Sequence, residues 1–454
     1  MRFIIPDYVL KTMDKLNING FEAFIVGGSL RDLLLKKEPS DYDITTNAKP
    51  EEIIQVFDGY KTILVGLEFG TVAVVMDGKN IEITTYRIEE EYLDGRKPSA
   101  VSFTNKLEED LSRRDFTINA MAYNKDRGIV DYFHGKDDLK KGIIRTVGDP
   151  RERFKEDHLR ILRAIRFASQ LNFTIEEETY HACKELVHSL KSISPDRIRD
   201  EVFKILLSPQ PSYGLKLMAD LGVLEAIIPD LAPTIGFDQR TPYHYNTLFE
   251  HIVCVVDKTP PILSLRLAAL FHDIGKPDTF TIDEEDKAHF YGHDRLGAQM
   301  TEEILKGLHC SNDLINRVRI LVKEHMNSHN EYGEKGLKRL ISNLGEEEVF
   351  HLIHLQKADR LCSHPGARID DLLEREIRIQ EILNFEEAYE KKQLDISGYD
   401  IISLGYKEGK IVGLIIDYLM DQVLEKPELN KKENLIEIVK EGAGIWESYL
   451  EQME

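Results

Sequence analysis

The segments typical of β-strands are confined to the first third of this chain. Apolar runs at 23–26, 71–76 and 80–86 alternate there with helical patterns. After about Glu156 the helical periodicity continues almost to the end. We therefore expect the α+β class, with a mixed sheet and helices in an amino-terminal head, followed only by helices.

The length of 454 residues predicts two to four domains at about 100–200 residues each. A helix is expected over 196–207, with Ser194 and Pro195 at its start. The stretch 229–242 holds three prolines and a glycine, which makes it the best candidate for a linker. A second helical region is expected over about 244–359.

Acidic residues outnumber basic ones, 80 to 59, and the formal net charge is −21. Taken over the whole chain, this balance argues against a surface that coats itself with nucleic acid. The segment 139–170 is an exception, because it holds nine basic residues against four acidic ones. Phosphate groups are therefore expected to bind there.

The sequence predicts a cytoplasmic protein. No stretch approaches the roughly 18 uninterrupted apolar residues of a membrane helix, and Pro6 and Asp7 break the amino-terminal apolar run. The cysteines are far apart and form no C-x-x-C pair, so we expect neither a disulfide framework nor a thiolate zinc site. Small buried hydrophobic side chains are the simplest expectation for Cys183, Cys254, Cys310 and Cys362.

Three acidic side chains of the head form a candidate metal site. Asp41 and Asp43 lie two residues apart in a short predicted strand, so both carboxylates would share one face. Glu82 stands between Ile81 and Ile83 in another strand and is placed to join them. Clustered carboxylates repel one another unless a cation neutralises them, and oxygen ligands beside phosphate suit paired Mg²⁺. For this pattern alone, an exposed strand face with solvated acids is the alternative.

Two further motifs accompany these acids. Gly27 and Gly28 follow a strand and open a helix, where backbone N–H groups and Arg31 could approach a triphosphate. An ordinary strand-to-helix turn is the alternative. An Arg-Arg-Asp sequence at 113–115 is expected to begin a helix, in which Asp115 is either a site residue or only an N-cap.

Asp157, Arg160, Arg163 and Arg166 recur every three residues, which on a helix predicts a stripe along one side. Three arginines at this spacing repel one another, and an anionic partner would explain them; a solvated charged face is the alternative. A carboxylate beside a guanidinium also fits the Watson–Crick edges of both C and A, which offer a donor next to an acceptor. Asp157 and Arg160 are therefore predicted to reject G and U, which would leave charged groups unpaired.

The order of these motifs resembles that of a known family. The sequences GGSLRD with DYD, TTYRIEEEYLDGRKPSAVSF, EEDLSRRDFTINAMA, EDHLRILRAIRF and SPDRIRDE are similar to those of the class II tRNA nucleotidyltransferases, which are the CCA-adding enzymes and the related bacterial poly(A) polymerases. The resemblance covers about residues 20–235. It implies a polymerase-β-like nucleotidyltransferase head at 1–140 and a helical neck at 141–235 that binds nucleotide and RNA.

The resemblance also implies roles for individual residues. Mg²⁺ would bind Asp41 and Asp43, with Glu82 as the third catalytic carboxylate. The implied nucleotide-binding residues are Gly28, Arg31, Arg114, Asp157, Arg160, Arg163 and Arg166. The segment 87–103 looks like the loop of enzymes that incorporate A, which favours complete CCA addition or A addition over C-C addition.

Histidines and aspartates in the later helical region form a second candidate metal site. Their order, H…HD…H…H…D, resembles that of the HD-superfamily metal-dependent phosphohydrolases over about residues 244–360. A transition metal (Mn, Fe, Ni, Co or Zn) is expected on His251, His272, Asp273 and Asp359, with His293 and His325 completing a second site or steering phosphate. An HD domain is expected at 236–366, where Lys276 is placed to meet phosphate, and a helical tail at 367–454.

The expected function is that of a CCA-adding tRNA nucleotidyltransferase, which uses CTP and ATP with Mg²⁺ on the 3′ end of tRNA. The HD domain is a candidate phosphohydrolase. One alternative is an A-adding enzyme or poly(A) polymerase of the same fold. Another is an HD-type phosphodiesterase whose head only binds RNA. The oligomeric state, the role of the tail and the HD substrate are left open.

Overall fold

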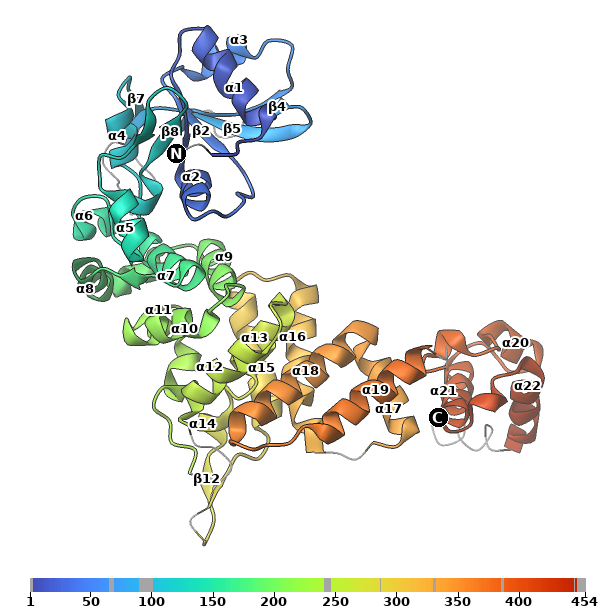
Figure 1. Ribbon diagram of the computed structural model, residues 1–454. Helices are drawn as coiled ribbons and strands as arrows, with labels where there is room; N and C mark the ends of the chain where they lie inside the picture. The colour runs from blue at the N-terminus through green and yellow to red at the C-terminus, as the bar shows by residue number, and fades with distance from the viewer. Residues whose placement is uncertain are drawn as a thin grey trace. The chain divides into compact units, whose positions relative to one another are not determined.

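The computed structural model describes residues 3–64, 69–89, 101–240, 246–285, 287–329, 332–384, 388–444 and 446 (Figure 1). The chain divides into two compact units. Unit 1 comprises Met1–Ala232 with Gly307–His309, and unit 2 comprises Pro233–Lys306 with Cys310–Glu454. The four-part division expected from the sequence is finer than this and stays a prediction.

A seven-stranded mixed sheet forms the first part of unit 1 (Figure 1). Its strands are β1 (Ala23–Val26), β2 (Asp43–Thr46), β3 (Thr62–Ile63), β4 (Thr71–Met76), β5 (Lys79–Thr85), β8 (Ala122–Asn124) and β9 (Gly128–Val130). They lie in the order β3-β4-β5-β2-β1-β8-β9. β2 and β5 run parallel, and the other neighbouring pairs are antiparallel. The expected mixed sheet is confirmed.

The turn between β4 and β5 and the alternating burial along β5 determine which side of the sheet Glu82 faces. β4 and β5 are joined by Asp77 and Gly78, which have φ values of 51° and 78°, as a two-residue hairpin turn requires. Along β5, Ile81 and Ile83 are buried, whereas Glu82 between them is exposed. Because successive side chains of a strand face opposite sides, Glu82 points away from the core.

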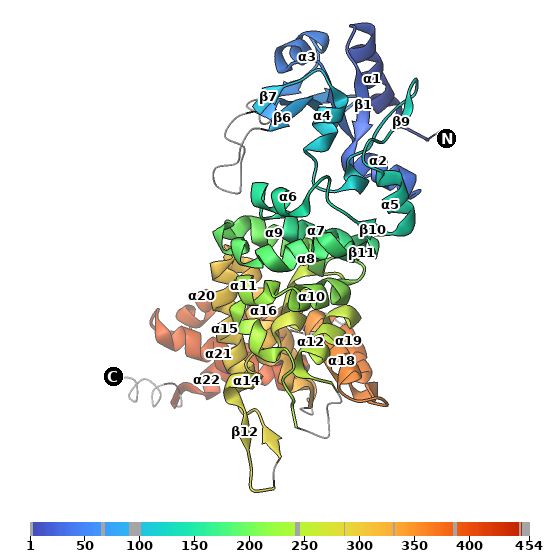
Figure 2. The same ribbon diagram turned by 90° about the vertical axis from the view of Figure 1, so that its left-hand side faces the viewer.

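Helices cover the sheet and then form a separate helical layer. Those near the sheet are α1 (Asp7–Ile18), α2 (Gly27–Leu34), α3 (Pro50–Val56) and α4 (Leu107–Ser112). The helical layer comprises α5 (Gly135–Lys141), α6 (Pro150–Glu156), α7 (Arg160–Leu171), α8 (Glu177–Leu186), α9 (Pro195–Leu206), α10 (Pro211–Asp220) and α11 (Val223–Ile227). Figure 2 shows α7, α8 and α9 close together. The helix predicted over 196–207 is α9, with Pro195 at its first position.

Three pairs of very short strands lie outside the main sheet. They are β6 (Arg87–Glu89) with β7 (Val101–Phe103), β10 (Ile143–Ile144) with β11 (Thr174–Ile175), and β12 (Thr281–Ile282) with β13 (Ala288–His289). The β6–β7 pair forms the base of the segment 87–103, which resembles the loop of enzymes that incorporate A. Residues 90–100 of that segment lie outside the described residues.

The prediction that residues 113–115 begin a helix was wrong. Here α4 has already ended, and after a turn the chain pairs with residues 145–147 through the bridge between Phe116 and Thr146. The Val147 N–H donates to the Asp115 carbonyl at 3.1 Å, and the Thr117 N–H donates to the Arg145 carbonyl at 2.9 Å. Only a single 3₁₀ turn follows, η2 (Thr117–Asn119). Pairing with a distant segment outweighs the local helical pattern.

The predicted four-residue stripe on one helix was also wrong at its first member. Asp157 ends α6 in an extended conformation, with φ −140° and ψ 104°, and α7 begins only at Arg160. The Asp157 carboxylate accepts a hydrogen bond from the Leu159 N–H at 3.1 Å. A carboxylate bound to a backbone N–H this close in sequence favours a turn over a continuing helix.

Unit 2 is mainly helical in the ranges that the structure describes. Its helices are α12 (Leu248–Lys258), α13 (Leu263–Phe271), α14 (Lys276–Thr279), α15 (His293–Gly307), α16 (Asn312–Glu324), α17 (Glu334–Leu344), α18 (Glu346–Ser363), α19 (Asp370–Asn384), α20 (Gly398–Ser403), α21 (Lys410–Glu425) and α22 (Lys432–Glu441). α12, α13, α16 and α18 pack against one another (Figure 1). Among the described residues, no helix combines the length and apolar character that crossing a membrane requires.

The expectation that the cysteines are only small buried hydrophobic side chains was wrong for Cys254 and Cys362, which form a disulfide. Cys254 in α12 is bonded to Cys362 in α18, across 108 positions of the chain. The spacing of cysteines in the sequence does not show which helices pack face to face, so the pair was missed. Cys183 is buried, as expected.

Gly214 in α10 is predicted to be necessary for the close packing of the helical layer. A Cβ there would lie 2.5 Å from the Ile205 Cγ2 and 2.9 Å from the Ser169 Oγ. Gly214→Ala should therefore lower the free energy of unfolding by about 1–3 kcal/mol, as overpacking does, measured by urea unfolding. The control is Gly413→Ala in α21, where nothing lies within 4 Å of the added Cβ. Equal destabilisation by both substitutions would contradict the prediction.

Candidate functional site

The turn from β1 into α2 brings the backbone close to an acid and a base. Gly27 has a φ of +69°, and a Cβ there would lie 3.1 Å from the Arg114 Nη1 and 3.7 Å from the Asp43 Oδ2. A Cβ on Gly28 would lie 3.5 Å from the Arg31 Nη2. The helix therefore begins with bare backbone between charged groups, an arrangement that suits phosphate.

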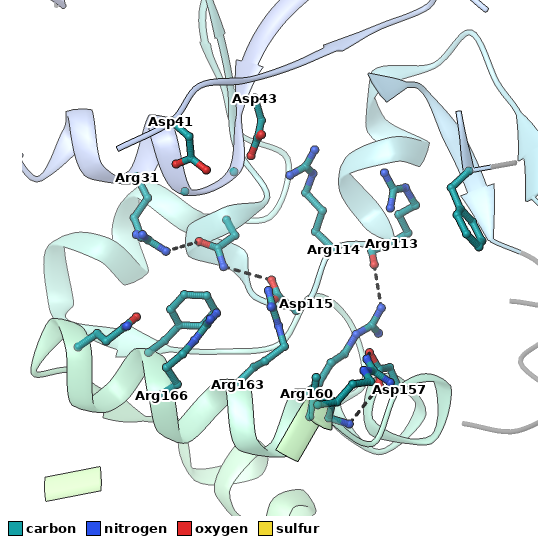
Figure 3. Close-up of a pocket in the computed structure, with 18 of the residues that line it drawn as sticks. Arg31, Asp41, Asp43, Arg113, Arg114, Asp115, Asp157, Arg160, Arg163 and Arg166 are labelled. Atoms are coloured by element: carbon teal, nitrogen blue, oxygen red, sulfur yellow. Dashed lines mark hydrogen bonds and ion pairs between the residues drawn. The ribbon is translucent and has the colours of Figure 1, made fainter. Parts of the chain in front are cut away.

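Three acidic side chains, Asp41, Asp43 and Glu82, lie close together at the sheet, and we call this place the carboxylate face. The parallel register of β2 and β5 sets Asp43 opposite Glu82. Asp41 lies just before β2, not within it as predicted, and it lines the same cavity as Asp43 (Figure 3). Burial, reinforced by the charges of Asp41 and Glu82, raises the pKa of Asp43 to about 6, although Arg114 acts in the opposite direction. Negative charge is therefore costly here, and oxygen ligands of this kind fit a hard divalent cation such as Mg²⁺.

A cavity of about 770 Å³ opens beside these acids, a volume that suits a nucleotide-sized ligand. Arginines dominate its lining: Arg31, Arg87, Arg113, Arg114, Arg160, Arg163, Arg166 and Arg197. The cavity brings together all the residues that the sequence analysis named for nucleotide binding, namely Gly28, Arg31, Arg114, Asp157, Arg160, Arg163 and Arg166. Their individual roles stay predictions.

Three of the arginines surround the ring of Phe167. The guanidinium carbons of Arg31, Arg163 and Arg166 lie 5.2, 5.4 and 4.3 Å from the ring centroid. Arg166 is also paired with Glu201, at 3.1 Å between Nε and Oε2. Burial lowers the pKa of Arg166 to about 10, and the neighbouring Arg163 adds to the effect. Cations gathered this closely favour an anionic ligand.

Asp115 and Asn119 connect two of these arginines, and Figure 3 shows Asp115 beside Arg163. Arg163 donates to the Asp115 Oδ2 through Nε at 2.8 Å and Nη2 at 2.5 Å. Asn119 donates to the Asp115 Oδ1 at 3.2 Å and accepts from the Arg31 Nη1 at 3.0 Å. Although burial opposes ionisation, Arg163 lowers the pKa of Asp115 to about 2. The sequence analysis assigned no role to Asn119, because no periodic pattern marks a residue in a 3₁₀ turn.

Asp157 and Arg160 line the same cavity and are held in place by other side chains. The Asp157 Oδ2 accepts from the Arg197 Nη2 at 2.8 Å. Arg160 donates to the Glu156 carboxylate at 2.5 Å and to the Arg113 carbonyl at 3.2 Å. Arg197 lies within the SPDRIRDE motif, but its contact was not predicted. Its contact with Asp157 joins residues 40 positions apart, which no local pattern reveals.

A second group of candidate ligands meets in unit 2. His251 lies in α12, His272 and Asp273 directly follow α13, His293 begins α15, His325 directly follows α16, and Asp359 lies in α18. The four histidines and Asp273 are buried. The structure thus brings all six predicted HD-site residues to one place.

Asp273 lies between two pairs of imidazoles. Its Oδ2 is 3.6 Å from the His251 Nε2 and 3.3 Å from the His272 Nε2. Its Oδ1 is 3.3 Å from the His293 Nε2 and 3.6 Å from the His325 Nε2. Each oxygen of one carboxylate therefore has its own pair of nitrogen donors.

Asp359 adds a second carboxylate to this cluster. Its Oδ1 lies 3.1 Å from the His251 Nε2. Although burial opposes ionisation, contact with His251 lowers the pKa of Asp359, and contact with His272 lowers that of Asp273 well below its usual range. The Lys276 Nζ lies 2.7 Å from the Asp273 Oδ2 and brings a positive charge to the same place. Imidazole nitrogens combined with carboxylate oxygens suit one or two transition-metal ions.

Three family descriptions match successive parts of the chain. Residues 23–145 match "Poly A polymerase head domain", residues 172–235 match "Probable RNA and SrmB- binding site of polymerase A", and residues 248–368 match "HD domain". The first two matches cover the carboxylate face and much of the helical layer. The third includes the histidine cluster.

Curated proteins named CCA-adding enzyme are similar to the chain. The enzyme of Ligilactobacillus salivarius (strain UCC118) is 34% identical over an alignment of 451 positions that covers 96% of this chain and 97% of that protein. The enzyme of Pediococcus pentosaceus is also 34% identical, over 94% of this chain and 96% of that protein. The alignment with the Lactobacillus helveticus enzyme reaches 48% identity but spans 50% of this chain and 57% of that protein.

Solved structures of the same kind share the fold. The Bacillus stearothermophilus CCA-adding enzyme in complex with CTP gives a TM-score of 0.75 at 26% identity, over 98% of this chain and 100% of that chain. The Thermotoga maritima CCA-adding enzyme complexed with tRNA_CCA gives a TM-score of 0.57 at 23% identity, over 97% of each chain. Because the likeness to curated relatives extends from the head through the HD domain, the chain belongs to the family of CCA-adding enzymes.

Proposed function

We propose that unit 1 adds nucleotides from CTP and ATP to the 3′ end of tRNA and so builds or repairs its terminal CCA. One observation carries this proposal: a single cavity joins the carboxylate face to an arginine-rich lining and to the Asp157–Arg160 pair. The names of the relatives, and the CTP complex of the similar Bacillus stearothermophilus enzyme, support it.

In the proposed reaction, the oxygen of the tRNA 3′-hydroxyl attacks the α-phosphorus. The bond from that phosphorus to the bridging oxygen breaks, and pyrophosphate leaves. The three carboxylates would hold Mg²⁺, whose chemistry is to activate the hydroxyl and neutralise the leaving phosphates. Arg31, Arg163 and Arg166 bind the triphosphate through charge-assisted hydrogen bonds. Asp115 and Asn119 keep two of these arginines in place.

Asp157 and Arg160 select the base in this proposal. Cytosine N4 and adenine N6 donate to a carboxylate, whereas cytosine N3 and adenine N1 accept from a guanidinium. Guanine and uracil present a carbonyl and a ring N–H at these positions, so each meets a group of the same kind. The contacts to Arg197 and Glu156 hold the two side chains in one geometry for both correct bases.

The test of the overall function uses tRNA transcripts that end before the CCA, after the first C, or after both. Each is incubated with the protein, Mg²⁺ and one NTP or all four, and the products are sequenced. Ordered addition of C, C and A supports the proposal. Addition of A alone, or of long A tails, favours the A-adding enzyme or the poly(A) polymerase.

Unit 2 is proposed to hold a transition metal and to act as a phosphohydrolase. The division of four imidazoles between the two oxygens of Asp273 supports this second function. A bound metal would polarise a phosphoryl group and supply a bound hydroxide, and Lys276 would neutralise phosphate charge. An HD-type phosphodiesterase whose head only binds RNA would show this activity without nucleotide addition.

Replacing Asp41 or Asp43 by Ala should reduce nucleotide addition by at least about a thousandfold, because the Mg²⁺ ligands contribute directly to phosphoryl transfer. Binding of tRNA, measured by filter retention, should change little, because basic side chains elsewhere contact its phosphates. Asp14→Ala is the control, since Asp14 is exposed on α1. Full activity of Asp41→Ala would rule out the proposed metal site.

Asp157→Ala should relax base selection. Loss of the carboxylate removes its repulsion of the carbonyls of U and G, so discrimination should fall by about 1–3 kcal/mol, or about 5- to 150-fold. The measurement is kcat/KM for each NTP on one tRNA transcript. Glu152→Ala is the control, because the Glu152 side chain in α6 is 67% exposed. An unchanged preference in Asp157→Ala would mean that this carboxylate only stabilises the turn before α7.

Purified protein should contain a transition metal in unit 2, and Asp273→Ala should lose it, because Asp273 faces both pairs of imidazoles. The metal content is measured by elemental mass spectrometry, and hydrolysis is assayed on a generic phosphodiester and on 2′,3′-cyclic nucleotides. Asp313→Ala serves as the control, since its side chain is 78% exposed on α16. Nucleotide addition should persist in both variants. Equal metal content and hydrolysis in wild type and Asp273→Ala would refute the HD site.

A further inference from the structure

The four histidines of the candidate HD site in unit 2 orient their rings in two different ways. For His272, His293 and His325, Nδ1 lies 2.9, 2.7 and 2.6 Å from the carbonyl of the residue three positions earlier. Each of these rings is therefore held by its own local backbone. A hydrogen bond at one ring nitrogen fixes the tautomer and directs the other nitrogen to a metal.

His251 is different, because its acceptor belongs to another helix. Its Nδ1 lies 3.4 Å from the carbonyl of Cys362 in α18, 111 positions away. The orientation of this ring therefore depends on how α12 and α18 are held together. Asp359, which lies 3.1 Å from the His251 Nε2, is carried by α18 as well.

The disulfide joins these two helices at the same level. Cys254 follows His251 by three residues, and Cys362 follows Asp359 by three residues. In an α-helix, residues three apart lie one above the other on one face. The cross-link, with a Cα–Cα distance of 5.9 Å, therefore lies about one helical turn from both ligands. It also fixes the residue whose carbonyl accepts from His251.

We propose that Cys254 and Cys362 are redox-active positioning residues for the metal site: their disulfide holds His251 and Asp359 in binding geometry, and its reduction weakens metal binding. This inference rests on the proposed metal site of unit 2. It concerns the ligands on α12 and α18, since the other three imidazoles take their acceptors from their own chain segments.

The reductant is a small-molecule thiol, and its first attack falls on Cys254, which is half-buried, whereas Cys362 is only 9% exposed. The thiolate bonds to the Cys254 sulfur, the S–S bond breaks, and Cys362 leaves as a thiolate that takes up a proton. A second thiol attacks the mixed disulfide on its small-molecule sulfur, and Cys254 is released and protonated in turn. The protein gains two electrons and two protons, and the two small thiols lose them as they form a disulfide.

The test measures Mn²⁺ affinity by electron paramagnetic resonance in the full chain. The host carries Asp41→Ala and Asp43→Ala, so that the head does not contribute bound Mn²⁺. One sample is oxidised, and the other is treated with excess small thiol and desalted under argon. Mass spectrometry verifies that the oxidised sample is lighter by two hydrogens. The Kd for Mn²⁺ should rise about tenfold on reduction, as when an outer partner of a metal-bound histidine is lost.

Variants in the same host separate the cross-link from other effects of reduction. Cys254→Ser and Cys362→Ser should show the weaker affinity in both samples and no response to thiol. Cys310→Ser is the control and should retain the response. Equal affinity in the oxidised and reduced host overturns the inference alone, and so does an oxidised host without the disulfide mass. Absence of Mn²⁺ binding in both the oxidised and the reduced sample overturns both this inference and the proposed metal site.

Discussion

The ion pair between Asp115 and Arg163 is the interaction on which the nucleotide cavity depends. Asp115 comes from the segment that pairs with residues 145–147, and Arg163 comes from α7 in the helical layer. Eight arginines line one cavity, and each added cation raises the repulsion unless a fixed anion compensates it. Removing one partner of a buried pair leaves an uncompensated charge, which is strongly destabilising. The protein therefore stabilises its arginines with internal acids before any ligand binds.

Unit 2 follows the same physical rule with different chemistry. In the head, carboxylates face guanidinium groups, and the only ligand atoms that these acids offer to a metal are oxygens. In unit 2, two carboxylates lie among imidazoles that are neutral donors when they bind a metal, and Lys276 supplies the permanent positive charge. Oxygen donors favour Mg²⁺, whereas mixed nitrogen and oxygen donors favour transition metals. In the proposed function, the two donor sets of this chain would therefore select different ions.

Much of this arrangement could be predicted from the sequence where the signal is local. The apolar runs at 23–26 and 71–76 coincide with β1 and β4, because burial on a sheet leaves a direct pattern in the residues. The ordered motifs likewise identified the acids and arginines of the cavity. What escaped prediction depends on partners far along the chain. The pairing of Phe116 with Thr146, the contact of Arg197 with Asp157, and the Cys254–Cys362 disulfide all arise from packing that no local spacing encodes.

The hairpin turn at Asp77 and Gly78 has a consequence for how this protein tolerates change. The turn lies at the surface, yet its two residues set the register in which Met76 faces Lys79 and, further along β5, Glu82 faces Ala73. Side chains alternate with a period of two, so a shift by one position would exchange the faces of the whole strand. Isoleucine methyl groups would then occupy the place of the third carboxylate. The position that Glu82 must occupy therefore limits insertions and deletions in this turn. The length of a surface turn is in this way tied to the function of a distant side chain.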